Sequence, residues 1–461
     1  MSDFTPFLAR WRTLPVQIIA LFTFALMPVW YRVPSDTPLI GSGDVSRFAI
    51  FIPAALTTFV WVMLGLPGIG RLLYGWRAVW LSCMVALGFW VYATSAWAYL
   101  ATQQPHLADN AALSWAVSIG FAVAVASVGL PARAVVGVLI FGVAWNGILA
   151  AQQVALQGSA GGLWQALKEF PIDISQPRIS VVQADGVRWL RPYGLLPHPN
   201  LLAGFLTIGL LACATGLTDR RVWRWLIGAG VWSIGLWALM LTFSRGAYFA
   251  FAVGGLLLLL LLRRAGLWNR ALVAGGLLTV LLGVFFILLY HPFLLARAGD
   301  GNETTEQYSL GERSMLTAAA VNGIRDAPVL GLGAGNMPWY SAYWLYVRDS
   351  PIQGNYPHNA ALTVWSELGG VGLLLWAGAL GSGLMAAFAA LKQRPPDMAF
   401  RAALICGFVA LIAAGLVEYY SVTMVHFMAG GWGLIAVALT PIPRPMLESP
   451  AFTAGLPMEG K

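Results

Sequence analysis

Apolar stretches of roughly 20 residues recur along nearly the whole chain. A helix needs about 20 mostly apolar residues to cross a hydrocarbon layer of about 30 Å. The pattern therefore predicts an all-α polytopic membrane protein with about twelve transmembrane helices. Their predicted limits are 14–31, 48–66, 78–101, 112–130, 132–154, 200–218, 222–243, 246–262, 271–290, 360–391, 400–417 and 422–440.

Basic residues gather on one side of these predicted spans. Lys and Arg near span ends are retained in the cytoplasm. With the N-terminus inside, the short external turns carry only Arg32, Arg47 and Arg245. The sequence therefore predicts an N-in/C-in topology. Fifteen basic residues mark the cytoplasmic side: Arg10, Arg12, Arg71, Arg77, Arg133, Arg220, Arg221, Arg224, Arg263, Arg264, Arg270, Lys392, Arg394, Arg401 and Arg444.

Two connections are too long to be simple turns, 155–199 and 291–359, and both fall on the external side. Long polar loops are typical of functional or unstructured segments. We therefore expect function on the external face. The predicted organisation is an N-terminal transmembrane bundle (1–154), an external loop (155–199), transmembrane helices six to nine (200–290), a large external catalytic loop (291–359), helices ten to twelve (360–440) and a cytoplasmic tail (441–461).

Composition excludes several classes of protein. The chain is 59% hydrophobic and only 10% charged, whereas a soluble domain carries roughly 25% charged residues. A soluble enzyme, a disordered chain and a nucleic-acid binder are excluded, and the net charge of +8 reflects mainly orientation. The three cysteines lie in apolar runs, so neither a disulfide framework nor a cysteine metal site is expected.

The larger external loop is expected to contain a helix. Ser309 and Glu312 have the spacing of a capping box, which predicts a helix from about 310 to 326 that ends before Pro328. Arg313 would lie in its first turn, where a cation opposes the helix dipole. An anion partner and an intramolecular salt bridge to Glu303, Glu306 or a neighbour both remain open. The expected buried face comprises Met315 or Leu316, Ala319, Ala320 and Ile324.

The loop continues through a glycine-rich turn to a histidine. Gly331–Asn336 has no preceding strand, so a dinucleotide site is excluded and a tight turn is expected, with room for a close ligand. His358 precedes a helix from Ala360 to Leu391, about 48 Å long, whose first turns should stand near or above the membrane surface. At a helix N-terminus the imidazole stays neutral and can accept a proton. The alternative is a capping role, and Asn359 can itself be the N-cap.

Two shorter segments supply further candidates. Pro199 forces extended backbone at His198, and Asn200 is a natural N-cap, so both have structural explanations, whereas Arg191 has no local role. Arg245 precedes an apolar run, 247–262, that is too short for a full crossing. We therefore expect the turn to dip below the lipid surface, where an arginine needs a partner. Snorkelling to headgroups is the alternative.

Together these segments resemble the O-antigen ligase and polymerase superfamily of bacterial membrane glycosyltransferases. The matching pieces are RPYGLLPHPN at 191–200, SRGA at 244–247, the 312–336 segment from ER to DAPVLGLGAGN, and PHN at 357–359. The resemblance implies that His358 is the family's essential loop histidine. It also implies that Arg191, Arg245 and Arg313 face phosphate. His198, Asn336 and Asn359 are secondary candidates.

The implied reaction transfers a glycan from undecaprenyl diphosphate, in the ligase branch to a hydroxyl of the lipid A–core oligosaccharide. The implied partners are lipid-linked O-antigen, lipid A–core and membrane lipids, at the periplasmic face of the bacterial inner membrane. The residues themselves favour the same chemistry, because an external enzyme lacks nucleotide sugars and needs a donor that carries its own leaving group. Arginines can neutralise a departing diphosphate, so we expect no cofactor, no metal, and inversion with His358 as the general base.

Several alternatives remain open. An O-antigen polymerase or an O-linked protein oligosaccharyltransferase fits the same motifs. A lipid flippase or secondary transporter would place charges or broken helices near mid-membrane, whereas Glu367 and Glu418 are expected at the interface. If a metal were required, its ligands would come from Asp300, Glu303, Glu306 or Asp326.

Overall fold

The computed structural model describes residues 4–30, 52–102, 105–167, 169–177, 179–184, 186–219, 221–298 and 304–440. Several predicted features lie outside the described residues: Arg32, Arg47, Arg220, the tail 441–461 with Arg444, and the alternative metal ligands Asp300 and Glu303. The side chains of Arg10 and Glu306 lie outside them as well.

Helices occur at each of the predicted spans. They are α1 (Phe4–Leu26), α2 (Ile52–Met63), α3 (Gly75–Thr102), α4 (Pro105–Val128), α5 (Ala132–Leu156), α7 (Pro199–Cys213), α8 (Val222–Leu241), α9 (Arg245–Arg264), α10 (Arg270–Ala298), α13 (Ala360–Lys392), α14 (Met398–Ala414) and α16 (Val425–Leu439). Within the described residues, 8 candidate spans are long and apolar enough to cross a membrane, and the apolar helices in α1, α2, α14 and α16 are shorter. The multi-pass helical character is therefore confirmed, while the number twelve and the orientation stay predictions.

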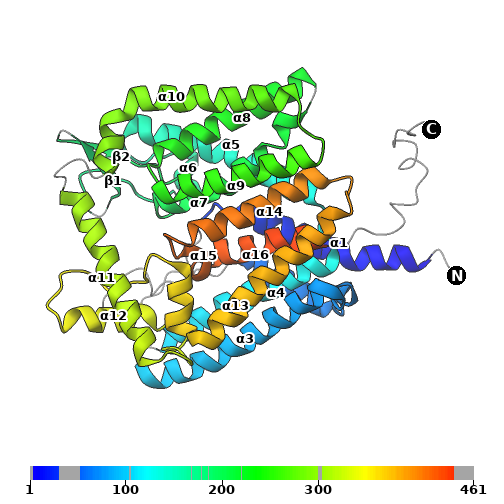
Figure 1. Cartoon of the computed structure of the whole chain (residues 1–461), viewed down its shortest axis with the longest axis horizontal. Helices are drawn as coiled ribbons and strands as arrows, with labels where there is room; N and C mark the ends of the chain where they lie inside the picture. The colour runs from blue at the N-terminus through cyan, green and yellow to red at the C-terminus, as the bar shows by residue number, and fades with distance from the viewer. Residues whose placement is uncertain are drawn as a thin grey trace.

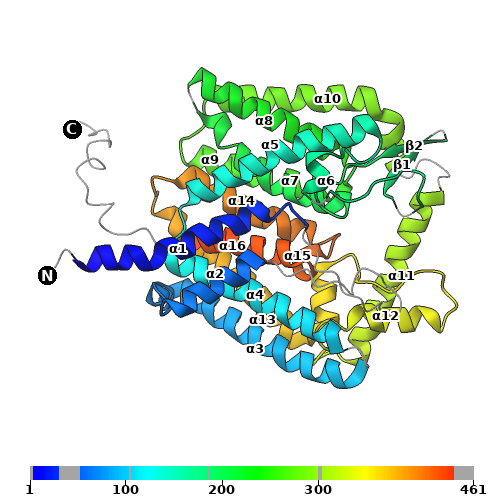
Figure 2. The same cartoon turned by 180° about the vertical axis from the view of Figure 1, so that it is seen from behind.

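The centre of the molecule is formed by α7 and α16, whose residues are all buried. A helix that is apolar on every side is stable only when neighbours surround it. Their neighbours include α4, α5, α8, α9, α13 and α14, which lie on either side of them in the two opposite views (Figures 1 and 2). Close approach requires small residues, and a Cβ at Gly433 would lie 2.7 Å from the Phe121 ring.

The first long connection contains a hairpin that the all-α prediction missed. Strands β1 (Val181–Ala184) and β2 (Val187–Leu190) pair antiparallel, with Val181 opposite Leu190, and a short helix α6 (Leu163–Ala166) precedes them. Each strand has four residues, too few for alternation to stand out from a loop. Gln153 of α5 fixes the chain after β2, because its Oε1 accepts hydrogen bonds from the backbone N–H groups of Tyr193 and Gly194.

The second long connection contains two helices where one was expected. Helix α11 (Thr304–Asp326) ends as predicted but begins earlier, so Ser309 lies inside it and the capping-box prediction was wrong. Arg313 is consequently not in the first turn, and the dipole argument for an anion partner does not hold. The predicted apolar face is buried through Leu316, Ala319, Ala320 and Ile324. Ala319 and Ala320 pack on α12 (Met337–Tyr346).

Helix α13 is broken at Gly369, which has φ 65° and ψ −174°, so the expectation of one continuous helix was wrong. The first part of α13 runs crosswise to the rest (Figure 1). The Gly331 turn lies against this break, since Leu332 N–H donates to Ser366 O (2.8 Å) and Gly370 N–H donates to Pro328 O (2.9 Å). The predicted tight turn is thus confirmed. It approaches backbone closely, because a Cβ at Gly331 would lie 2.3 Å from Glu367 O.

Helix α9 is longer than the sequence predicted. It has 20 residues and begins at Arg245 itself, which is about 30 Å at 1.5 Å per residue and long enough for a crossing. A short helix therefore does not explain the position of Arg245. On the described part of the chain, α11, α12 and the hairpin lie at one end of the molecule, opposite the end at which α1 begins (Figure 2).

Candidate active site

A single buried carboxylate joins three of the conspicuous polar segments. Glu418 lies between α14 and α15 (Tyr420–Thr423) and is only 8% exposed. Its Oε1 accepts hydrogen bonds from Asn200 Nδ2 (2.7 Å) and Arg313 Nη2 (3.3 Å). Its Oε2 lies 3.4 Å from His358 Nδ1. These partners enclose Glu418, and its depth at the membrane interface stays a prediction.

The start of α13 holds His358 in place. Asn359 is the N-cap, and its Oδ1 accepts a hydrogen bond from Leu362 N–H (2.9 Å). The Asn359 Nδ2 donates to Leu416 O (3.0 Å), which ties α13 to the segment that carries Glu418. The His358 ring meets Tyr419 edge-on, with centroids 5.2 Å apart. His358 thus lies directly before the cap, fixed from two sides.

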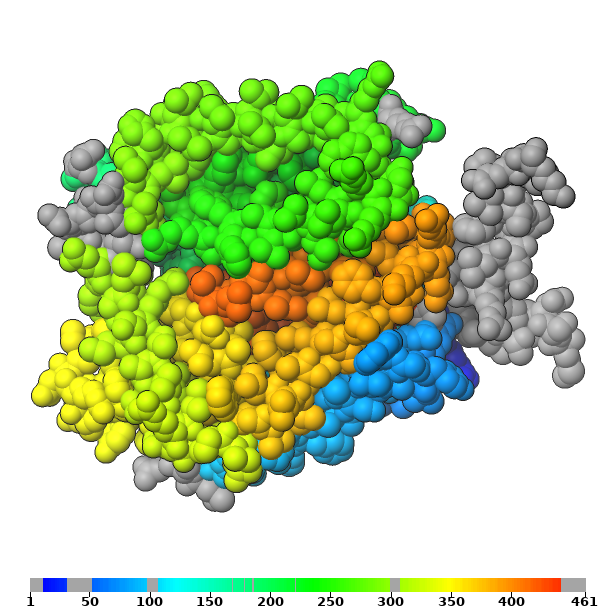
Figure 3. Space-filling view, viewed as in Figure 1, coloured from blue at the N-terminus to red at the C-terminus, as the bar shows by residue number. Residues whose placement is uncertain are grey.

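Next to this cluster is a pocket of about 280 Å³. Three cations line it: Arg245 at the start of α9, Arg297 in the last turn of α10 and Arg313 of α11. Arg245 Nη1 donates to Arg297 O (2.5 Å), which joins α9 to α10. The surface is hollowed between these two helices (Figure 3). The remaining lining residues are Asn200, Ser244, Gly246, Phe249, Val417 and Glu418.

Arg191 lies behind the pocket. It is only 6% exposed. Its Nε donates to Thr242 O and its Nη2 to Asn200 Oδ1, both at 2.6 Å. Burial, reinforced by the charge of Arg297, lowers the pKa of Arg191 to about 9, so the guanidinium is still charged at neutral pH. Hydrogen bonds therefore link Arg191 through Asn200 to Glu418.

His198 takes the capping role that the sequence suggested for Asn200. Its φ of −156° and ψ of 141° confirm the extended backbone expected before Pro199. Nδ1 of His198 accepts the Asn200 N–H (3.1 Å) and Nε2 lies 3.2 Å from Ser180 Oγ. Burial, with the Arg191 charge, lowers the pKa of His198 to about 3. His198 is thus neutral and engaged at both nitrogens.

The neighbouring side chains determine the protonation state of Glu418. Burial acts to raise its pKa, but the contact with His358 and the charge of Arg313 outweigh burial, so the pKa lies below its usual value. Glu418 is therefore an anion at neutral pH. Sequence reasoning missed Glu418 and Arg297, since a lone carboxylate or arginine at the end of an apolar run looks like an ordinary interfacial residue.

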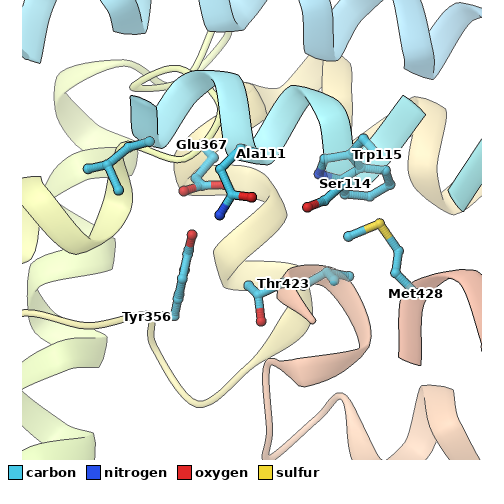
Figure 4. A pocket seen from close by; sticks show the side chains of 10 residues that line it. Ala111, Ser114, Trp115, Tyr356, Glu367, Thr423 and Met428 are labelled. Carbon is cyan, nitrogen blue, oxygen red and sulfur yellow. The ribbon is translucent and has the colours of Figure 1, made fainter. Parts of the chain in front are cut away.

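Asn336 belongs to a different part of the structure. It precedes α12, and its Nδ2 donates to Leu332 O (2.9 Å) within the glycine-rich turn. Glu367 of α13 is buried, and its Oε1 accepts the Met337 N–H (3.1 Å). A cavity of about 30 Å³ adjoins Glu367, with the Tyr356 hydroxyl pointing towards it (Figure 4). This arrangement holds α12 on α13.

Among the described side chains, no group of three or more His, Cys, Asp or Glu residues is arranged to hold a metal ion. Asp326, one of the alternative ligands, instead accepts a hydrogen bond from the Tyr340 hydroxyl (2.5 Å).

Comparison with protein families gives one match. Residues 229–377 match the family described as O-antigen ligase, which supports membership of the O-antigen ligase superfamily and bears out the resemblance seen in the motifs. The matched region contains Arg245, Arg297, Arg313 and His358. No curated protein matches the chain.

Proposed function

We propose that this chain, which carries an O-antigen ligase family domain, transfers a glycan from undecaprenyl diphosphate to a hydroxyl of the lipid A–core oligosaccharide. The reaction would take place at the periplasmic face of the bacterial inner membrane and complete lipopolysaccharide. One observation carries the proposal: the pocket lined by Arg245, Arg297 and Arg313 adjoins the pair formed by His358 and Glu418.

The arginines form the donor site in this proposal. Guanidinium groups bind phosphate through paired N–H donors, and Arg245, Arg297 and Arg313 approach the pocket from three different helices. The three positive charges would attract a diphosphate and hold it in the pocket. The same charges would stabilise the leaving diphosphate as the glycosidic bond breaks.

His358 would act as the general base. It takes the proton of the acceptor hydroxyl, whose oxygen attacks the anomeric carbon while the carbon–oxygen bond to diphosphate breaks. The electron pair leaves with undecaprenyl diphosphate, and the single displacement inverts the anomeric centre. Glu418, 3.4 Å from Nδ1, would orient the ring and stabilise the imidazolium that forms, as a carboxylate does in hydrolytic triads.

Arg191 would serve as a positioning residue. Its Nε and Nη2 atoms donate hydrogen bonds to Thr242 O and Asn200 Oδ1. Arg191 would therefore hold Asn200 against Glu418 rather than contact phosphate directly, as the motifs had implied. Its charge still lies close enough to the pocket to add to the positive potential, since Arg297 perturbs it. His198 would likewise support the chain before α7.

The discriminating experiment is the lipopolysaccharide profile of a strain that lacks the protein, complemented with wild type or with His358→Ala. Loss of long-chain bands with accumulation of lipid-linked polymer indicates a ligase, whereas single-repeat capping indicates a polymerase. Glycan missing from proteins instead would indicate an oligosaccharyltransferase. Full rescue by His358→Ala would favour a flippase or transporter, because transport needs no base on a hydroxyl.

A further inference from the structure

The segment from Pro328 to Val347 lies in the predicted external loop, yet it is bonded to a membrane helix. Four backbone hydrogen bonds join the two where α13 breaks: Leu332 N–H to Ser366 O, Gly333 N–H to Glu367 O, Gly370 N–H to Pro328 O and Val371 N–H to Val329 O. The polar groups exposed by the break are thereby satisfied, as irregular backbone near lipid requires.

The position of the break fixes the depth of this segment. From Gly370 to Lys392 the helix measures about 35 Å at 1.5 Å per residue, close to the roughly 30 Å thickness of the hydrocarbon layer. Lys392 belongs to the basic residues that mark the predicted cytoplasmic side. The break, and the turn bonded to it, therefore lie at the level of the opposite headgroups.

Helix α12 begins at this level, because Met337 N–H donates to Glu367 Oε1 two residues before the break (3.1 Å), and it presents an aromatic face. Trp339, Tyr343, Tyr346 and Val347 follow a helical spacing that places them on one side. Tyr343 is 59% and Tyr346 78% exposed, while Met337 and Leu345 on the other side are buried. The rings of Trp339 and Tyr343 lie nearly parallel, 6° apart. Large exposed aromatic side chains are costly in water and favourable among lipid headgroups.

Further exposed apolar residues and an arginine lie on the turn and at the end of α12. Val329 and Leu330 are exposed on the turn, and the Trp365 indole donates to Pro328 O (3.1 Å). Arg348 stacks on Trp344 with its guanidinium carbon 3.8 Å from the ring centroid. An arginine beside an aromatic group fits the phosphate level of a bilayer.

We propose that α12 and the turn at 328–331 form an interfacial anchor that binds the headgroup region of the outer leaflet. The anchor is independent of the proposed reaction, but it has a consequence for it. Helix α12 packs on Ala319 and Ala320 of α11, and α11 carries Arg313. The anchor thus sets the height of Arg313 relative to the membrane, where a lipid-linked diphosphate lies.

The test is depth measurement by spin labelling of the full chain in phosphatidylcholine nanodiscs. In a background with Cys83, Cys213 and Cys406 replaced by Ala, a nitroxide is attached after Tyr343→Cys or Tyr346→Cys, and Val187→Cys on the hairpin is the matched exposed control. We expect the ratio of oxygen to nickel-chelate accessibility to be several-fold higher at 343 and 346 than at 187.

The alternative occupant of this face is a glycan, which would stack on the same rings. Equal nickel-chelate accessibility at 343, 346 and 187 would overturn the anchor, and immobilisation of those labels by soluble polysaccharide would then assign the face to sugar. The measurement needs no turnover. The anchor can therefore be disproved while the proposed transferase activity is confirmed, and the activity can be disproved while the anchor is confirmed.

Discussion

Nδ1 of His358 lies 3.4 Å from Oε2 of Glu418, and the other oxygen of the same carboxylate accepts a hydrogen bond from Arg313 Nη2. The proposed base and a proposed phosphate ligand therefore share one anion. A shared anion couples the two roles, because protonation of His358 and binding of a diphosphate by Arg313 both alter the field at Glu418.

The first prediction concerns the coupled pair formed by His358 and Glu418. His358→Ala should lower the single-turnover rate by about 10²–10⁴-fold and leave donor binding nearly intact, since His358 does not line the arginine pocket. Glu418→Gln should also slow turnover, because it removes the carboxylate that stabilises the imidazolium. Single-turnover rates and donor titrations on detergent-purified protein measure both effects.

The double variant is the control. If Glu418 acts through His358, Glu418→Gln should add little to the defect of His358→Ala. Fully multiplicative defects would mean that the two side chains act independently. Wild-type turnover in His358→Ala would remove this residue from the mechanism, and His198 would become the next candidate for the base.

The second prediction concerns the arginines that line the pocket. Arg245→Ala, Arg297→Ala or Arg313→Ala should each weaken donor binding by about 1.5–3 kcal/mol, the contribution of a hydrogen bond to a charged group, and turnover should fall with affinity. Lysine should restore only part of the loss, because it keeps the charge and lacks the planar fork.

Arg325 of α11 offers a matched control, since it lies in the last turn of the same helix and does not line the pocket. Arg325→Ala should keep the donor affinity of the wild type. Equal losses in Arg325→Ala and Arg313→Ala would point to long-range charge rather than direct contact.

Arg191 should affect stability differently from an exposed arginine such as Arg325. Removal of its buried side chain leaves Thr242 O and Asn200 Oδ1 without their donor, and a buried unsatisfied group costs about 1–3 kcal/mol. Arg191→Ala should therefore lower the melting temperature measurably, whereas Arg325→Ala, at an exposed position, should not. An unchanged melting temperature for Arg191→Ala would contradict the positioning role.

The lowered pKa of His198 predicts that the stability of the folded chain depends on pH. Its pKa falls from 6.5 to about 3 on folding, so below pH 6.5 the unfolded chain binds a proton that the folded chain does not. The stabilisation is complete above about pH 6.5 and declines as the pH falls towards 3, by about 2 kcal/mol at pH 5. His198→Asn keeps an N-cap acceptor and should flatten this slope in thermal unfolding at a series of pH values.

Metal independence is the last prediction, and it rests on arginines in the role that a cation would otherwise fill. The purified enzyme should keep its activity in excess chelator. A loss restored by magnesium or manganese would require ligands among Asp300, Glu303, Glu306 and Asp326.

The sequence by itself determined the membrane class, the location of the helices at the predicted spans and the segments that carry the chemistry. Apolar runs and turn residues are local signals, so the positions of α8, α9 and α14, the cap at Asn359 and the tight turn at Gly331 followed from neighbours in the chain. Motifs indicated Arg245, Arg313 and His358 because each lies in a short distinctive string of residues.

Only the tertiary structure decided which of these side chains meet. Glu418 lies at the end of an ordinary apolar run, and its role depends on Asn200, Arg313 and His358 arriving from three distant segments. The break in α13 likewise depends on the 328–333 turn, which supplies hydrogen bond partners on either side of Gly369. Such long-range pairing leaves no periodic trace in the sequence, because hydrophobic spacing records which face of a helix is buried and not what buries it.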